Sequence, residues 1–266
     1  MCICTKAPWI FDLFFFSVFF FSAECGAATF TFKNQCGYTV WPGILSNAGS
    51  PLLGNGGFKL ESGQSASLEA PEGWSGRVWG RTGCSFAIAG TSGGVCVTGD
   101  CAGRLQCSGA GAETPATLAE FTLASGGAGN DFYDVSLVDG FNLPLSIVPL
   151  NSTCKPASCN ASIDSVCPAE LRVLSPDNTG AVVGCKSACL AFGTPRYCCS
   201  GDYATPSACK PTSYSRFFKA ACPSAYSYAY DDPSSLYTCS ASTYTITFCP
   251  NSSSSTTRYL LLYLKL

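Results

Sequence analysis

Short stretches of alternating apolar and polar residues recur along most of the chain. The first runs from Ala28 to Leu45 (ATFTFKNQCGYTVWPGIL) and is rich in Thr, Phe, Val and Tyr. Similar runs follow at GRVWGRT, LAEFTL, DFYDVSLVDGFNLPLSIVP and YTITFCP, separated by clusters of Gly, Ser, Pro and Asn. This alternation is typical of half-buried strands. Because helical stretches of about 10–15 residues do not separate the runs, the pattern predicts a mainly β fold, a sandwich rather than βαβ units.

Two cysteine clusters interrupt the strand pattern. Residues 154–222 are dense in cysteine and predict a lobe of loops and short helices, with helical pieces at SVCPAELRVL and SACLAF, the latter ended by Gly193 and Pro195. A smaller cluster predicts a disulfide-stapled hairpin excursion at 82–107. We therefore expect one domain over 28–250, whose sandwich core comprises 28–81, 108–153 and 223–250.

The two ends of the chain differ from this domain. Residues 1–27 contain Lys6, then an apolar run and then small residues, which is the layout of a secretory signal peptide. A buried helix or membrane anchor is the alternative, but the run is shorter than the roughly 20 residues that span a bilayer. Residues 251–266 form a Ser-rich tail with a short apolar end, too short for a glycolipid anchor signal.

The cysteine count supports secretion. The chain has 19 cysteines, and removal of a leader that carries Cys2, Cys4 and Cys25 leaves an even set of sixteen. An even set in a secreted chain predicts a disulfide framework, formed in an oxidising compartment, although spacing alone leaves the pairing open. Zinc binding is the alternative, and the absence of histidine disfavours it. We expect no metal and no organic cofactor.

Net charge excludes some partners. The formal net charge is −2, from 15 Lys and Arg against 17 Asp and Glu. No basic stripe with interleaved aromatic residues is present, so nucleic acid is not an expected partner. Adhesion to anionic membranes through bulk charge is disfavoured for the same reason.

The stretch VCVTGDCAGRLQC, from Val95 to Cys107, resembles the signature of the thaumatin family, the fifth class of plant pathogenesis-related proteins. Similar text occurs at VWGRTGC, TLAEFTL, DFYDVSLVDGFNLP, YCCSGDY, YSRFFKAACPSAYSYAYDD and YTITFCP, which together span most of the domain. One departure is Ser92, where the family pattern has Gly. The resemblance implies a thaumatin-like sandwich and a monomeric, extracellular protein of the plant cell wall or apoplast.

The resemblance also implies how the sixteen cysteines pair. The implied bridges are Cys36–Cys249, Cys84–Cys96, Cys101–Cys107, Cys154–Cys239, Cys159–Cys222, Cys167–Cys185, Cys189–Cys198 and Cys199–Cys209.

Family members carry an acidic cleft between the sandwich and the cysteine-rich lobe. Matched motif by motif, its residues are Arg81, Glu120, Asp134, Asp139 and Asp231, although Asp232 leaves the last register open. The alternative is structural: the acidic side chains are simply solvated at strand ends, and the arginine neutralises them. Clustered carboxylates raise one another's pKa, so one can donate a hydrogen bond while its neighbour accepts. Such a pair suits sugar hydroxyls and, at the right spacing, glycoside cleavage.

We therefore expect a secreted antifungal defence protein that binds the β-1,3-glucan of a fungal surface. One alternative is a weak endo-β-1,3-glucanase that uses Glu120 and Asp134, with Glu120 as the acid. Another is a protein that permeabilises fungal membranes, which the negative net charge disfavours. Sweet taste and a receptor ectodomain find no support in the sequence.

Three Asn-X-Ser/Thr motifs are candidate N-glycosylation sites: Asn151, Asn160 and Asn251. Asn160 stands beside Cys159, which is expected to hinder it.

Overall fold

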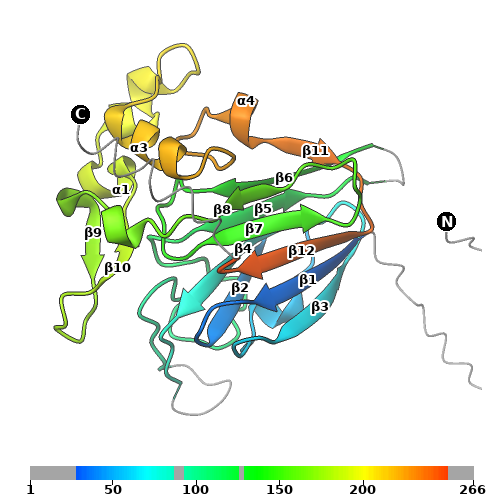
Figure 1. Cartoon of the computed structure of the whole chain (residues 1–266). Helices are drawn as coiled ribbons and strands as arrows, with labels where there is room; N and C mark the ends of the chain where they lie inside the picture. The colour runs from blue at the N-terminus through cyan, green and yellow to red at the C-terminus, as the bar shows by residue number, and fades with distance from the viewer. Residues whose placement is uncertain (1–27, 87–92, 126–128, 251–266) are drawn as a thin grey trace, which may run out of the picture.

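The computed structural model describes residues 28–86, 93–125 and 129–250, and two five-stranded sheets packed face to face form its centre (Figure 1). The first sheet has the order β3–β1–β12–β7–β8, with β1 Ala28–Asn34, β3 Ser65–Ala70, β7 Leu145–Pro149, β8 Ala157–Cys159 and β12 Thr243–Phe248. The second has the order β11–β6–β5–β4–β2, with β2 Val40–Ser46, β4 Ser75–Thr82, β5 Leu118–Thr122, β6 Asp131–Ser136 and β11 Tyr237–Cys239. The predicted mainly β sandwich is confirmed.

The first and last strands of the sandwich lie side by side. β1 pairs in parallel with β12, with Phe30 opposite Tyr244, and the other pairs within the two sheets are antiparallel. Because these two strands come from opposite ends of the domain, the sheet closes only when nearly the whole chain has folded.

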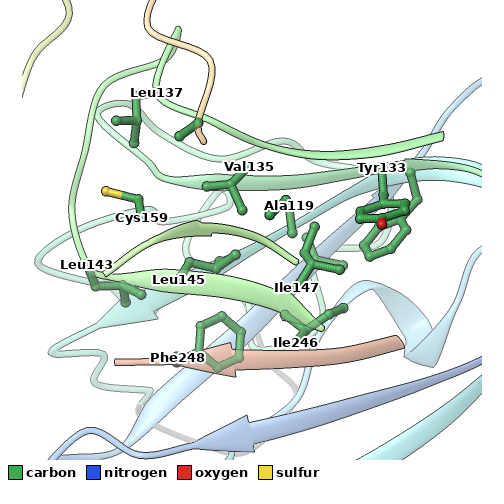
Figure 2. Packing of buried hydrophobic residues seen from close by; sticks show 14 of the residues in the cluster. Ala119, Tyr133, Val135, Leu137, Leu143, Leu145, Ile147, Cys159, Ile246 and Phe248 are labelled. Carbon is green, nitrogen blue, oxygen red and sulfur yellow. The ribbon is translucent and has the colours of Figure 1, made fainter. Parts of the chain in front are cut away.

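Apolar residues that alternate along each strand fill the space between the sheets. Figure 2 shows Ala119 and Val135 of one sheet facing Ile147 and Ile246 of the other, and all four are fully buried. An aromatic group continues this core, because the rings of Phe30 and Phe121 lie 4.6 Å apart between their centroids.

The excursion packs on the outer face of β4. Trp79 is fully buried there with Cys101, Cys107, Ala116 and Leu118. Its indole Nε1 donates to the carbonyl of Gly99 at 2.7 Å. Gly43 on the neighbouring strand leaves room for the ring, since a Cβ atom at this position would lie 2.4 Å from it.

The cysteine-rich lobe lies at one end of the sandwich (Figure 1). It contains α1 Ala188–Phe192, α2 Pro195–Cys198, α3 Ser213–Ala221, the 3-10 turns η2 Asp164–Val166, η3 Ala169–Leu171 and η4 Gly201–Tyr203, and a hairpin of β9 Arg172–Leu174 with β10 Val182–Cys185. Outside the lobe are the turn η1 Gly54–Gly56 and the short helix α4 Asp232–Ser235.

Only one of the two predicted helical pieces is a helix. SACLAF forms α1, which ends where Gly193 takes a left-handed conformation with φ of 64°. SVCPAELRVL was expected to be helical, and this is wrong: the segment forms the two turns η2 and η3 and then β9. Pro168 lies between the two turns, with ψ of 139°, and its missing N–H and extended backbone interrupt a helix there.

The longest helix, α3, was not predicted. A capping box begins it: the hydroxyl of Thr212 accepts from the Ser215 N–H, and the hydroxyl of Ser215 accepts from the Thr212 N–H. The Thr-x-x-Ser pattern from Thr212 to Ser215 is the sequence signal for this helix start.

Eight disulfide bridges link the cysteines of the domain in the pairs that the resemblance implied. They are Cys36–Cys249, Cys84–Cys96, Cys101–Cys107, Cys154–Cys239, Cys159–Cys222, Cys167–Cys185, Cys189–Cys198 and Cys199–Cys209. The first spans 213 positions and fastens the end of the domain to its beginning.

Some expectations fall outside the described residues: the signal peptide 1–27 with Cys2, Cys4 and Cys25, the departure at Ser92, and the tail 251–266 with Asn251. Within residues 28–86, 93–125 and 129–250, no helix is long and apolar enough to cross a membrane.

Candidate functional site

Three charged side chains form a row across the second sheet. Arg77 on β4 is the register partner of Glu120 on β5, and Glu120 is the register partner of Asp134 on β6. Direct partners in antiparallel strands share a face, with Cβ atoms about 5 Å apart. Because Ala119 and Val135 point into the core, this row occupies the outer face.

The opposite wall comes from two loops. Asp139 lies in the turn that follows β6, and Asp232 begins α4. The backbone of Tyr226 lies beside the end of β6. Its N–H donates to the carbonyl of Val135, and its carbonyl accepts from the N–H of Leu137. The row and these residues line an open cleft of about 330 Å³.

Asp134 is the most strongly perturbed carboxyl of this cleft. It is 9% exposed, and its Oδ1 atom is buried without a hydrogen-bond partner among the described residues. Burial, together with the charges of Glu120 and Asp232, raises the pKa of Asp134 to about 8. Asp134 therefore keeps its proton near neutral pH.

The pKa of Glu120 is shifted in opposite directions by burial and by neighbouring charges. Burial raises the pKa of Glu120, the Arg77 guanidinium lowers it, and the charge of Asp139 raises it again, with a net upward shift. The Nε atom of Arg77 lies 3.8 Å from Oε1 of Glu120, and both side chains are about one-third exposed. The row thus combines one cation, one carboxyl whose upward pKa shift is opposed by the neighbouring guanidinium, and one carboxyl with a larger upward shift.

Arg81 does not lie in the cleft, and its expected role there is wrong. Its side chain is fully buried beneath the excursion, where its guanidinium donates to four backbone carbonyls. These carbonyls belong to Trp41, Pro42, Arg104 and Leu105, at distances of 2.6–3.2 Å. Arg77, four residues earlier on the same face of β4, supplies the cation of the cleft instead.

The charge of Arg81 is unusual because it lies in a buried site lined by carbonyl groups. Burial lowers the pKa of Arg81 to about 10, although the charge of Asp100 opposes the shift. The guanidinium remains charged at neutral pH and ties β2 to the excursion.

Asp231 also lies away from the cleft, and Asp232 takes its expected place. The buried carboxylate of Asp231 accepts from Ser227 and Ser234 and forms an ion pair with Lys219 of α3 at 2.9 Å. Burial raises the pKa of Asp231, but Lys219 and the serines outweigh it and hold the pKa below its usual value. Asp231 therefore fixes the loop, and the exposed Asp232 faces the cleft.

This arrangement can both donate and accept hydrogen bonds. Protonated Asp134 offers a donor, whereas Asp232 accepts a hydrogen bond from the Tyr226 hydroxyl at 3.2 Å. Carboxyl groups beside an aromatic ring fit the alternating hydroxyls and flat faces of a sugar.

The glycosylation motifs differ in their accessibility. Asn151 is exposed, and its Oδ1 atom accepts from the Thr153 hydroxyl at 2.9 Å. Asn160 is half-buried, and its Oδ1 atom is enclosed without a partner in the part of the chain that the structure describes.

Comparisons with known proteins give a consistent result. The sequence model of the Thaumatin family matches residues 34–250. A pathogenesis-related thaumatin-like protein 3.5 from Cryptomeria japonica is 55% identical over 237 residues, which cover 88% of this chain and 95% of the relative. A protein from Prunus avium named glucan endo-1,3-beta-glucosidase is 54% identical over 228 residues, covering 84% and 91%. Among solved structures, the thaumatin-like xylanase inhibitor TLXI aligns with 83% of this chain and 99% of its own, with 27% identity and a TM-score of 0.45.

We predict that the two arginines of β4 respond differently to the same substitution. Arg81→Met leaves four carbonyls without their donor and should lower the free energy of unfolding by about 3 kcal/mol or more. Arg77→Met, on the same face, removes an ion pair whose side chains are about one-third exposed and should cost less than about 1 kcal/mol. Denaturant unfolding of the oxidised proteins measures both; equal losses would contradict this division of roles.

We predict that Asp134 makes the folded protein less stable as pH rises. Its pKa of about 8 in the folded state lies above the ordinary 3.8, so its contribution to stability is full below pH 4 and is lost on the way to pH 8. Asp134→Asn removes this ionisation, so the variant should exceed the wild type in Tm at pH 9 by roughly 2 °C or more. Thermal unfolding from pH 4 to 9 tests this. Parallel Tm curves for the two proteins would show that Asp134 titrates normally.

Proposed function

The chain belongs to the thaumatin family, and we propose that it is a plant antifungal defence protein that binds β-1,3-glucan-type polysaccharide in the acidic cleft. The pathogenesis-related name of the Cryptomeria relative supports the defence role. The cleft is open at the surface and lined by hydrogen-bonding groups, which favours a polysaccharide as its ligand.

The row itself carries this proposal: Arg77, Glu120 and Asp134 stand side by side on the outer face, and the buried Oδ1 of Asp134 has no hydrogen-bond partner among the described residues. A sugar hydroxyl both donates and accepts, so it needs a partner of each kind. Asp134 keeps its proton while Asp139 and Asp232 provide acceptors across the cleft. Arg77 adds a fixed donor at the end of the row.

The setting of this function is part of the proposal. We infer that the protein is secreted as a monomer into the cell wall or apoplast, where eight bridges remain oxidised. Asn151 is the best placed of the described motifs to carry a glycan, because it is exposed and Asn160 is not.

Weak endo-β-1,3-glucanase activity is a second candidate. The name of the Prunus avium relative favours it, as does the direct pairing of Glu120 with Asp134. Retaining glycosidases use two carboxyl groups about 5–5.5 Å apart, one as nucleophile and the other as acid, so this activity requires that separation between Glu120 and Asp134. Since Asp134 holds its proton more firmly, Asp134 is the better acid and Glu120 the better nucleophile, the reverse of the assignment expected from the sequence.

We predict that binding to insoluble β-1,3-glucan depends on this pair. Glu120→Ala and Asp134→Ala should each weaken retention about tenfold, whereas Asp134→Asn, which can still donate and accept, should retain most of it. A sedimentation assay with the particulate glucan measures the bound fraction. Glu69→Ala, an exposed carboxylate on β3 of the other sheet, is the matched control. Unchanged retention in both alanine variants would place the binding site elsewhere.

Hydrolysis has a different signature in the same variants. If the cleft cleaves glucan, Asp134→Asn should still bind but should release reducing ends at least about a hundredfold more slowly, because the amide cannot protonate the leaving oxygen. Glu120→Gln should lose release as well. Reducing-sugar assays on soluble β-1,3-glucan decide the matter; binding without release by the wild type would leave recognition as the function of the cleft.

A further inference from the structure

A second, larger cavity lies where the sandwich, the excursion and the lobe meet. Its volume is about 550 Å³, within the ~300–1,000 Å³ that is usual for small-ligand sites. It is lined by Tyr38, Trp41, Thr82, Val97, Asp164 and Val183, among others, and shares no lining residue with the acidic cleft. We call it the aromatic pocket.

The two rings of the aromatic pocket are held in place but remain accessible. Trp41 is half-buried, and its ring packs edge-on against Phe86 with 6.5 Å between centroids. The main chain beneath it is fixed, because the Trp41 carbonyl accepts from Nε of Arg81 at 3.0 Å. Tyr38 is 49% exposed, and its hydroxyl lies 3.7 Å from Sγ of Cys249. A flat apolar ligand surface can therefore approach these rings without rearrangement of the backbone.

Asp164 supplies a polar group whose hydrogen bonding is unfulfilled. Its Oδ1 atom is buried and has no hydrogen-bond partner among the described residues. Buried polar atoms are nearly always paired, so each exception requires an explanation. Burial raises the pKa of Asp164 to about 7, and near that pH the carboxyl can serve either as donor or as acceptor.

We propose that the aromatic pocket binds one or two rings of a neutral, β-linked glucose oligosaccharide, which stack on Tyr38 and Trp41 and hydrogen-bond to Asp164. In β-glucose all ring substituents are equatorial, so both faces of the ring are flat and apolar and suit aromatic surfaces. A hydroxyl satisfies Asp164 in either protonation state. The choice of glucose rests on the proposed function, whereas the pocket itself stands on its own residues.

Tryptophan fluorescence can follow binding in this pocket. Trp74 and Trp79 are fully buried, whereas Trp41 lines the pocket. Titration of the secreted protein, which lacks Trp9 of the predicted leader, with a β-1,3-linked glucose trisaccharide should give a saturable change in emission, and Trp41→Phe should abolish it. Tyr38→Ala should weaken binding about tenfold by removal of one stacking face, and because Tyr38 is half-exposed the fold should persist.

Asp164 has its own pair of variants. Asp164→Leu, similar in shape but unable to hydrogen-bond, should weaken binding of the trisaccharide about threefold to tenfold. Asp164→Asn should bind it like the wild type. The cleft variant Glu120→Gln with Asp134→Asn should titrate like the wild type.

Two results would overturn the proposal: no saturable change with the trisaccharide, or a change that the cleft variant abolishes and Tyr38→Ala leaves intact. Either result is distinguishable from failure of the proposed function, which is read from sedimentation with particulate glucan. If the protein sediments with glucan but its fluorescence does not change, the proposal for the aromatic pocket fails and the proposed function stands. If the fluorescence changes but Glu120→Ala sediments with glucan like the wild type, the proposal for the cleft fails and the proposal for the aromatic pocket stands.

Discussion

The register of β4, β5 and β6 is the constraint on which the cleft depends. Because side chains alternate with a period of two, a shift of one residue would turn Glu120 into the core and Ala119 outward. The packed inner face prevents that shift, since Val135 and Ala119 are fully buried between the sheets. The hydrophobic core between the sheets therefore sets the positions of the charged groups.

The cleft contains a carboxyl group that destabilises the folded protein, and the rest of the domain compensates for it. A buried carboxyl without a hydrogen-bond partner destabilises a fold, and Asp134 is such a group within the described residues. Bridges such as Cys36–Cys249, which join distant parts of the chain, restrict the unfolded state and so offset local costs of this kind. Arg81 acts in the same direction, because it fastens the excursion over the sheet through main-chain carbonyls. The domain is thus rigid around a cleft that is itself unfavourable.

The sequence was enough to predict the sandwich and most of the cleft. It was not enough to choose between two nearby residues of the same type. Alternation predicted the strands around Glu120 and Asp134, because burial follows the period of the strand. Arg77 and Arg81 share a face of β4, so alternation cannot separate them; only their register partners and the cover of the excursion do. Asp231 and Asp232 differ because Asp231 forms an ion pair with Lys219 of α3, a contact that the sequence pattern does not reveal. In both pairs, one member holds the scaffold and the other faces the cleft.

If the cleft binds a polysaccharide as proposed, its charged groups bear on which kinds of polysaccharide fit. Among the described residues that line the cleft, Arg77 is the one basic side chain, and it stands against four carboxyl groups. A polymer that carries carboxylates would meet repulsion there, and such repulsion between like charges is an effective basis of discrimination. A neutral polymer meets none, and its hydroxyls can use both forms of the carboxyl groups. Under the proposed function, the cluster of carboxyl groups that raises the pKa of Asp134 would also favour uncharged chains, so recognition and any proton transfer would depend on one electrostatic arrangement.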